Sequence, residues 1–418
     1  MSQRIRFPAT WLARLARRFW SGDAWQYPGG KRDLRLDFLR GFAVVAMVVD
    51  HIGGEHSWLY AVTGGDRFFV SVAEAFIFLS GLVMGTIYAG IIVRQGLGAA
   101  LMKCLHRVGS LYLLTVSLTL GYAVVLFHLG HWGVPEGAAV DWPDFVMSAV
   151  TLHRTVYLTD IMLLYTLLIL AAVPVFVLLL HGYTAFVLAG SWGLWLLWQL
   201  SPQHTQFPWP VVNNYFHFSA WQVVFMTALV IGYHRQYLEA RLARLSLPVV
   251  LGVTGTLAVG AIAFYAAQPL AGTDYAWLVD RLFGKADLRI GRLVLFAGFF
   301  GFAYTLLTVA WEPLSRACAW LLLPLGQKAL TAYNVHLFVV AILTKLPNWM
   351  VGDAPATTLQ NTFLQALGVL MIWTMLRLQP TVVAYGSCWI AWLKDLSTLR
   401  QKDFYAPGYA AHRKSLPL

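Results

Sequence analysis

Residues 36–52 read LDFLRGFAVVAMVVDHI and form the most informative stretch of the chain. Nearly every residue between Arg40 and His51 is apolar, which is typical of a helix inside a membrane. Eleven helical steps of about 100° bring these two side chains back to nearly the same face, about 16 Å apart along the axis. Ionisable residues inside a membrane are costly and are usually functional. The spacing therefore predicts a polar groove in which Arg40 anchors a charged ligand at the mouth and chemistry occurs at the far end, beside His51.

The composition predicts an all-α, polytopic membrane protein. Of the 418 residues, 59% are hydrophobic and 12% are charged, and that charged fraction is about half of what a soluble protein carries. Long apolar stretches predict about ten transmembrane helices. We place them near residues 36–53, 68–91, 108–130, 157–180, 183–200, 218–233, 247–268, 290–311, 329–350 and 362–387.

The basic residues indicate the orientation of the chain. Most of the 30 lysine and arginine residues lie in alternate loops, and the positive-inside rule then places both termini in the cytoplasm. The same distribution accounts for the net charge of +11 without a nucleic-acid partner. Lys103, His106 and Arg107 cluster in the first inner loop, either as part of this orientation signal or as contacts for phosphate groups. The three cysteines lie near inner loops, where reduced thiols are expected.

We divide the chain into a basic cytoplasmic segment 1–35, a transmembrane domain 36–393 and a basic cytoplasmic tail 394–418. In the first segment, apolar side chains on one helical face oppose arginines on the other, which predicts an amphipathic helix at the membrane surface. A disordered basic tail is the alternative. The apolar residues are Trp11, Leu12, Leu15 and Phe19, and the basic ones are Arg14, Arg17 and Arg18.

The outer loop 201–217 is rich in proline, amide and aromatic side chains. The prolines exclude a continuous helix there. Its aromatic rings could stack on sugar rings while its amides hydrogen-bond hydroxyl groups. An ordinary aromatic belt at the membrane surface is the alternative.

His51 is the leading candidate for a general base, because a neutral imidazole in a low-dielectric site can take a proton at neutral pH. A carboxylate would orient it and stabilise the imidazolium. Asp50 is adjacent in sequence, but neighbouring helix positions point about 100° apart. Glu74 or Asp160, from other helices, are equally suitable partners. The alternative is a histidine that only satisfies contacts in the core.

Asp37 and Arg40 are three residues apart and can pair on a helix. The alternative for Arg40 is an arginine that extends toward the inner membrane surface. The chain has no glycine-rich phosphate loop, no HExxH metal signature and no G-x-S-x-G motif, so these residues are not explained by a common motif.

Several motifs resemble those of the OpgC family, and Arg40-x10-His51 is similar to the signature of the wider acyltransferase-3 membrane family. The chain departs from the OpgC pattern at Phe69–Ala73 and at Met162–Leu164, and these departures bear on the acceptor more than on the reaction class. The matching runs, in order along the chain, are RDLRLDFLRG (32–41), DHI (50–52), AEAFIFLSG (73–81), YLTDIMLLY (157–165), SAWQ (219–222) and LGQKALTAYNVH (325–336).

This resemblance implies a ten-helix acyltransferase of the bacterial cytoplasmic (inner) membrane that moves an acyl group from cytoplasmic acyl-CoA to a sugar hydroxyl outside. OpgC proteins are associated with succinylation of osmoregulated periplasmic glucans, so succinyl-CoA is the expected donor, with acetyl-CoA as the alternative. The implied partners are acyl-CoA, an extracytoplasmic glycan and membrane lipids. No metal is implied, and the oligomeric state stays open, a homodimer included.

In this interpretation the catalytic residues are His51, Asp50 and Glu74. The nucleotide part of CoA stays near Asp37, Arg40, Lys103 and Arg107, while the thioester reaches His51. The expected oxyanion or acceptor contacts are Ser80, Arg154, Asp160, Tyr165, Trp221, Gln222, Asn334 and His336.

A succinyl donor also requires a cation near His51, because an unpaired carboxylate in low dielectric is costly. Arg154 and Arg67 precede spans on the outer side, and we choose Arg154 because it leads into the Asp160 motif. The alternative is an interfacial pair of Arg154 with Asp141 or Asp144.

A transporter of a lipid-linked sugar or an organic anion is the rival function. Broken helices in inverted halves would favour it, and we detect no such symmetry in the sequence.

Overall fold

The structure is a computed structural model that describes Trp25, Tyr27 and residues 32–54, 56–65, 68–129, 141–212, 214–267, 272–345 and 357–379. Every secondary-structure element in these described residues is a helix, as the composition predicts. The predicted N-terminal amphipathic helix, Arg67 and the tail 394–418 lie outside the described residues.

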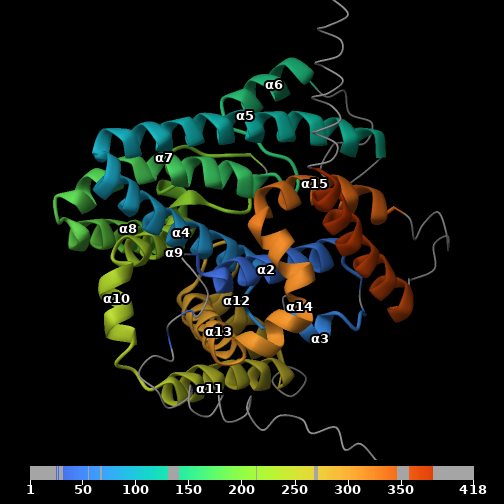
Figure 1. Ribbon diagram of the computed structural model, residues 1–418. Helices are drawn as coiled ribbons and strands as arrows, with labels where there is room; N and C mark the ends of the chain where they lie inside the picture. Colours follow the sequence, from blue (N-terminus) through green and yellow to red (C-terminus); the bar gives the residue numbers. More distant parts are fainter. Residues whose placement is uncertain are drawn as a thin grey trace, which may run out of the picture.

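Figure 1 labels the helices in chain order. They are α2 (Leu34–Ile52), α3 (Tyr60–Thr63), α4 (Val72–Gln95), α5 (Leu97–Leu129), α6 (Trp142–Val150), α7 (Asp160–Leu180), α8 (Thr184–Leu200), α9 (Phe218–Tyr233), α10 (Arg235–Leu242), α11 (Leu247–Ala266), α12 (Gly272–Phe283), α13 (Ile290–Val309), α14 (Trp311–Gln327) and α15 (Ala329–Leu343), followed by the unlabelled helix Thr358–Gln379.

Each predicted span overlaps one of these helices in the described residues. Among the described residues, 6 helices are long and apolar enough to cross a membrane: α4, α5, α7, α11, α13 and Thr358–Gln379. The apolar helices α8, α9 and α15 are shorter, and α2 carries several ionisable residues. The chain is therefore a polytopic helical membrane protein, and the count of ten crossings remains a prediction.

The structure differs from the sequence interpretation in the loops. Helix α5 begins at Leu97, directly after a turn at Gly96 with a φ of 85°, so Lys103 and Arg107 stand on a helix and not in a loop. Short helices also occupy predicted loops, namely α6, α10, α12 and α14. Hydropathy does not reveal such helices, because their polar faces lower the average over a span-sized window.

Helix α2 lies in the centre of the fold, with α4, α14 and α15 around it (Figure 1). Helix α2 approaches α14 closely because a glycine on each helix lies against the backbone of the other. A β-carbon at Gly41 would overlap Leu322, and one at Gly326 would overlap the carbonyl oxygen of Asp37. Small residues of this kind allow helix backbones to touch in membranes. The first half of the helix that carries Arg40 and His51 is thus held against α14.

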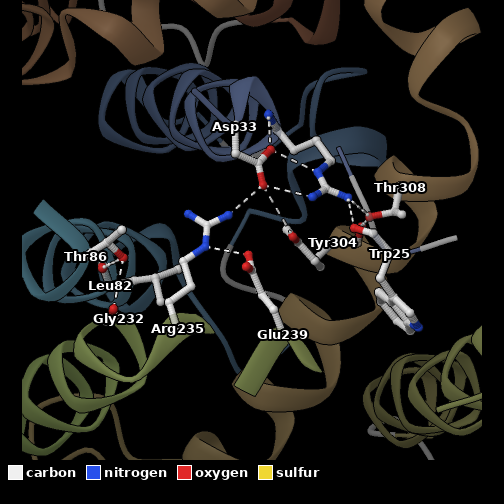
Figure 2. A network of polar contacts seen from close by, with 10 residues as sticks. Trp25, Asp33, Leu82, Thr86, Gly232, Arg235, Glu239, Tyr304 and Thr308 are labelled. Carbon is white, nitrogen blue, oxygen red and sulfur yellow. Dashed lines mark hydrogen bonds and ion pairs between the residues drawn. The ribbon is translucent and has the colours of Figure 1, made fainter. Parts of the chain in front are cut away.

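A buried polar network fixes the start of α2 (Figure 2). Asp33 caps the helix by accepting from the backbone N–H of Arg35 at 3.1 Å, and it also accepts from the Arg235 guanidinium at 3.2 Å. Arg35, 2% exposed, donates to Thr308 at 2.9 Å. Burial alone would raise the pKa of Asp33. The hydrogen bonds from Arg35 and the positive charges of Arg35 and Arg235 outweigh burial, so the pKa of Asp33 is lowered. The network ties α2 to α10 and α13.

Candidate active site

The imidazole of His51 meets a second imidazole. Its Nδ1 atom lies 3.0 Å from Nε2 of His336 on α15, and the two ring centroids are 5.2 Å apart. His336 is fully buried, whereas His51, at the C-terminal end of α2, is partly exposed. His336 is therefore the more deeply buried of the two rings.

The hydrogen bonds around His336 determine the tautomers of both rings. Nδ1 of His336 is bonded to the backbone carbonyl of Tyr333, and because a carbonyl only accepts, this nitrogen carries the hydrogen. In a neutral His336 the Nε2 atom then accepts, and Nδ1 of His51 is its donor. Nε2 of His51 is left with the free electron pair. The pair thus presents a basic nitrogen on the partly exposed ring.

Asp160 lies at the same end of the site as the histidine pair. The hydroxyl of Tyr333 donates to the carbonyl of Leu158, two residues before Asp160. The Asp160 carboxylate accepts from the backbone N–H groups of Tyr215, at 3.1 Å, and Ile161, at 3.0 Å. Asp160 is therefore held by backbone donors, and the described partner of His51 is an imidazole.

The turn that joins α12 to α13 brings Lys285 to this end. The Lys285 ammonium is near enough for its charge to act on His51 and on Asp160. Indole N–H groups fix the turn: Trp221 donates to the carbonyl of Ala286 at 3.1 Å. Trp195 donates to the carbonyl of Leu288 at 2.9 Å, and Trp198 donates to the carboxylate of Asp287 at 3.0 Å. Trp221, which we expected as a direct contact, thus positions the turn that carries Lys285.

Arg40 is at the opposite end of α2. Its guanidinium donates to the carbonyl of Leu79 at 3.1 Å and lies 3.8 Å from Asp37. The next residue along α4, Ser80, shares a hydrogen bond of 2.9 Å with the hydroxyl of Tyr165, and the charge of Arg40 acts on that tyrosine. Ser80 and Tyr165 therefore lie with Arg40. They are thus near Arg40 at the opposite end of α2 from His51, where we expected the oxyanion contact.

The predicted phosphate contacts reach the same end from α5. Arg107 is exposed, and its charge acts on both Arg40 and Tyr165. Lys103, one turn earlier, is exposed and donates to Gln95 at 2.7 Å. The structure thus brings Arg107 to Arg40, with Lys103 on the adjoining surface.

Glu74 is engaged with an arginine. It is fully buried, accepts from the N–H and hydroxyl of Ser71 at 2.9 and 2.6 Å, and forms an ion pair with Arg292. Burying both charges together avoids the high cost of burying either one alone. The described contacts of Glu74 are therefore to Ser71 and Arg292 and not to His51.

The remaining predicted contacts are dispersed. Gln222 binds Ser191 of α8 through both of its amide atoms, which is a helix-packing role. The side-chain oxygen of Asn334, two residues before His336, is buried without a hydrogen-bond partner among the described residues. Arg154 lies 3.3 Å from Asp144, which is the interfacial pair that the sequence left open as the alternative.

The outer loop forms a small pocket against α7, α8 and α9. Its lining includes Gln206, Trp209, Asn214 and Phe216. Trp209 stacks on His153 with ring centroids 5.3 Å apart. The pocket combines aromatic and amide side chains, as a sugar-binding surface does, but at least one of its rings already has a partner within the protein.

Sequence reasoning did not identify Lys285 and Arg292 as site residues. Arg292 was counted as part of a span, and its position inside an apolar stretch was the signal that could have found it. No group of three or more histidine, cysteine or acidic side chains suited to a metal occurs in the part of the chain that the structure describes.

With the geometry established, comparison with known proteins gives the family. The family model described as OpgC protein matches residues 32–382, most of the chain. The protein belongs to the OpgC family. Comparison with curated proteins and with solved structures gives no match. Membership in the OpgC family implies a glucan-modifying acyltransferase, and the match covers both Arg40 and His51.

Proposed function

We propose that this OpgC protein is an O-acyltransferase of the bacterial inner membrane that moves a succinyl group from cytoplasmic acyl-CoA to a hydroxyl of an extracytoplasmic glycan. The observation that carries the proposal is that the two ends of α2 differ chemically. Arg40 makes one end cationic, and His51 places a basic imidazole about 16 Å further along the same helix. The pantetheine arm of CoA is of the same order in length.

The donor would bind with its phosphates at the cationic end. Arg40 and Arg107 supply the charge there, Lys103 lies on the adjoining surface, and the Asp37 carboxylate lies 3.8 Å from the Arg40 guanidinium. The thioester then extends along α2 to His51. Holding donor and acceptor together at this point supplies the orientation part of catalysis.

At the reaction centre, Nε2 of His51 takes the proton of the acceptor hydroxyl while the hydroxyl oxygen attacks the thioester carbonyl. The carbon–oxygen bond forms, the tetrahedral intermediate collapses, and the carbon–sulfur bond breaks. The imidazolium returns its proton to the departing thiolate, so that free CoA and the glycan ester leave. Asn334 is our candidate to donate a hydrogen bond from its side-chain NH2 group to the developing oxyanion, because it lies on α15, the helix that carries His336.

His336 acts through His51. By accepting from Nδ1 of His51 it keeps the free electron pair on Nε2, and it shares the positive charge when the imidazolium forms. Its bond to the Tyr333 carbonyl fixes its own orientation. In this proposal His336 does the work that a carboxylate does in a serine hydrolase.

The test is acyl transfer by the purified protein in lipid vesicles, with succinyl-CoA as donor and periplasmic glucan as acceptor. We expect free CoA to appear together with succinylated glucan, measured by thiol titration and mass spectrometry. His51→Ala should lower the rate by about 10²-fold or more, as loss of a general base does, with CoA binding retained. The control is His181→Ala, because His181 is exposed at the end of α7.

The rival is transport of a sugar-lipid or an organic anion. Movement of labelled substrate across the vesicle without release of CoA would establish that function instead. Near-normal transfer by His51→Ala would remove His51 from the mechanism.

A further inference from the structure

Arg292 is a buried arginine in which one nitrogen of the guanidinium has no hydrogen-bond acceptor among the described residues. Its side chain is 6% exposed and forms an ion pair with Glu74 through Nε. Its Nη1 atom donates to the backbone carbonyl of Phe283 at 3.3 Å. Its Nη2 atom is buried and has no hydrogen-bond partner among the described residues.

The unused nitrogen makes no hydrogen bond to Glu74 in the structure. One oxygen of Glu74 accepts from Ser71 twice, and the other accepts from Nε of Arg292. A buried donor without an acceptor is costly, and the guanidinium fork is well suited to a carboxylate. The arrangement therefore points to an anionic group that binds Nη2 when the site is filled.

The position of Arg292 relates it to His51. Phe283, which Arg292 contacts, is two residues before Lys285, and the charge of Lys285 acts on His51. Because Trp221 and Trp195 hold the backbone of this turn, Lys285 and Arg292 are fixed relative to each other. Two cations thus come from the short segment 285–292, and the charge of one of them, Lys285, acts on the proposed general base.

A dicarboxylic acyl donor has the anionic group that this segment fits. In a succinyl thioester, two methylene groups separate the free carboxylate from the reacting carbonyl, so the carboxylate enters the membrane interior with the acyl group. There it requires a cation. Arg154 pairs with Asp144 at 3.3 Å and is 31% exposed, whereas Arg292 is 6% exposed and lies where a carboxylate most requires a cation.

We propose that Arg292, together with Lys285 of the preceding turn, forms the subsite that binds the free carboxylate of a dicarboxylic acyl donor and so selects succinyl over neutral acyl groups. This inference rests on the proposed acyl transfer. It assigns donor specificity to the turn between α12 and α13 and to the first turn of α13.

The experiment compares succinyl-CoA with butyryl-CoA, which has the same chain length and a methyl group in place of the carboxylate. For the unaltered protein we expect kcat/KM to favour succinyl-CoA by about tenfold or more. Arg292→Gln should lower kcat/KM for succinyl-CoA by about 10- to 100-fold, the range for a hydrogen bond to a charged group. Transfer of butyryl should change far less.

Two further variants make the comparison specific. Arg292→Lys keeps a positive charge against Glu74 but loses the planar fork, so we expect an intermediate loss of succinyl transfer. Arg281→Gln removes an exposed arginine of α12 that lies over the Trp277 ring, and the donor preference should stay unchanged.

The outcomes distinguish failure of the proposed subsite from failure of the proposed acyl transfer. Equal use of the two donors by the unaltered protein would overturn the subsite without any variant, and so would equal losses for both donors in Arg292→Lys. If the unaltered protein transfers neither acyl group, the proposed function itself fails and the subsite with it.

Discussion

At the scale of the residue, the partner of His51 differs from the one that the sequence predicts. We expected a carboxylate to orient this imidazole, with His336 as a substrate contact. The described bond joins two imidazoles at 3.0 Å. A neutral pair needs no buried charge in the resting site, which suits a position inside a membrane. The cost is a weaker stabilisation of the imidazolium than a carboxylate would provide.

The role of His336 can be tested with two amides of different length. In His336→Gln the amide oxygen lies near the position of Nε2 and can accept from His51. In His336→Asn the amide reaches only the position of Nδ1. We therefore expect His336→Asn to lower kcat by about 10²-fold or more, and His336→Gln to retain much more of it, with donor KM unchanged in both.

Steady-state kinetics with the purified variants give this result, and thermal unfolding shows whether both fold alike. If the two variants lose the same activity, or if the loss is confined to KM, His336 does not set the tautomer of His51.

The limits of sequence reasoning at this scale follow from distance along the chain. Arg40 and His51 are on one helix, so their spacing is readable from helix geometry. His51 and His336 are 285 positions apart, and Glu74 and Arg292 are 218 apart. Such pairs depend on how helices pack, which periodicity does not contain.

At the scale of the element, glycines control how closely α4 approaches α9. A β-carbon at Gly81 would overlap the carbonyl oxygen of Phe225, and one at Gly85 would overlap that of Leu229. From α9, Gly232 meets the backbone of Leu82 in the same way. The two glycines of α4 are four apart, which is the spacing of close helix contacts in membranes. Helix α4 carries Glu74 and Ser80, so this contact positions both ends of the site.

The same substitution at two glycines should have opposite effects. Gly85→Ala pushes α4 away from α9, and we expect it to lower the free energy of unfolding by about 1–3 kcal/mol, as overpacking does. At Gly190 in α8, a β-carbon would meet nothing within 4 Å. Gly190→Ala should therefore raise stability by up to about 1 kcal/mol, because alanine favours the helix.

Unfolding of the two variants in the same detergent measures the difference, and acyl transfer should fall only in Gly85→Ala. A Gly85→Ala variant as stable as the unaltered protein would mean that the backbone contact is not required.

The elements themselves were largely readable from the sequence. Long apolar stretches correctly located the helices that match the predicted spans, because hydropathy is averaged over the whole length of a span. The short helices were missed for the same reason. Helix α12 is the consequential case, since the turn after it holds Lys285 and leads to Arg292.

At the scale of the whole molecule, the site has two chemically different ends. Arg40 and Arg107 are together at one end, and His51, His336 and Lys285 are together at the other. The positive-inside distribution of basic residues predicts that the first end faces the cytoplasm. In the proposed function the donor then comes from one side of the membrane and the acceptor from the other.

This arrangement predicts that CoA binds from the cytoplasmic face alone and that salt weakens the binding, because Arg107 is exposed and exposed charges are screened. Arg107→Gln should reduce affinity by about two- to fivefold, as expected for a solvent-exposed charge pair, and should lessen the salt dependence. Arg316→Gln is the matched control, since Arg316 is 74% exposed and pairs with Glu312 on α14. Donor titrations on vesicles of known orientation make the measurement. Saturable binding from the outer face only would reverse the proposed path of the acyl group, and equal effects of the two substitutions would show that Arg107 acts only through the general charge of the surface.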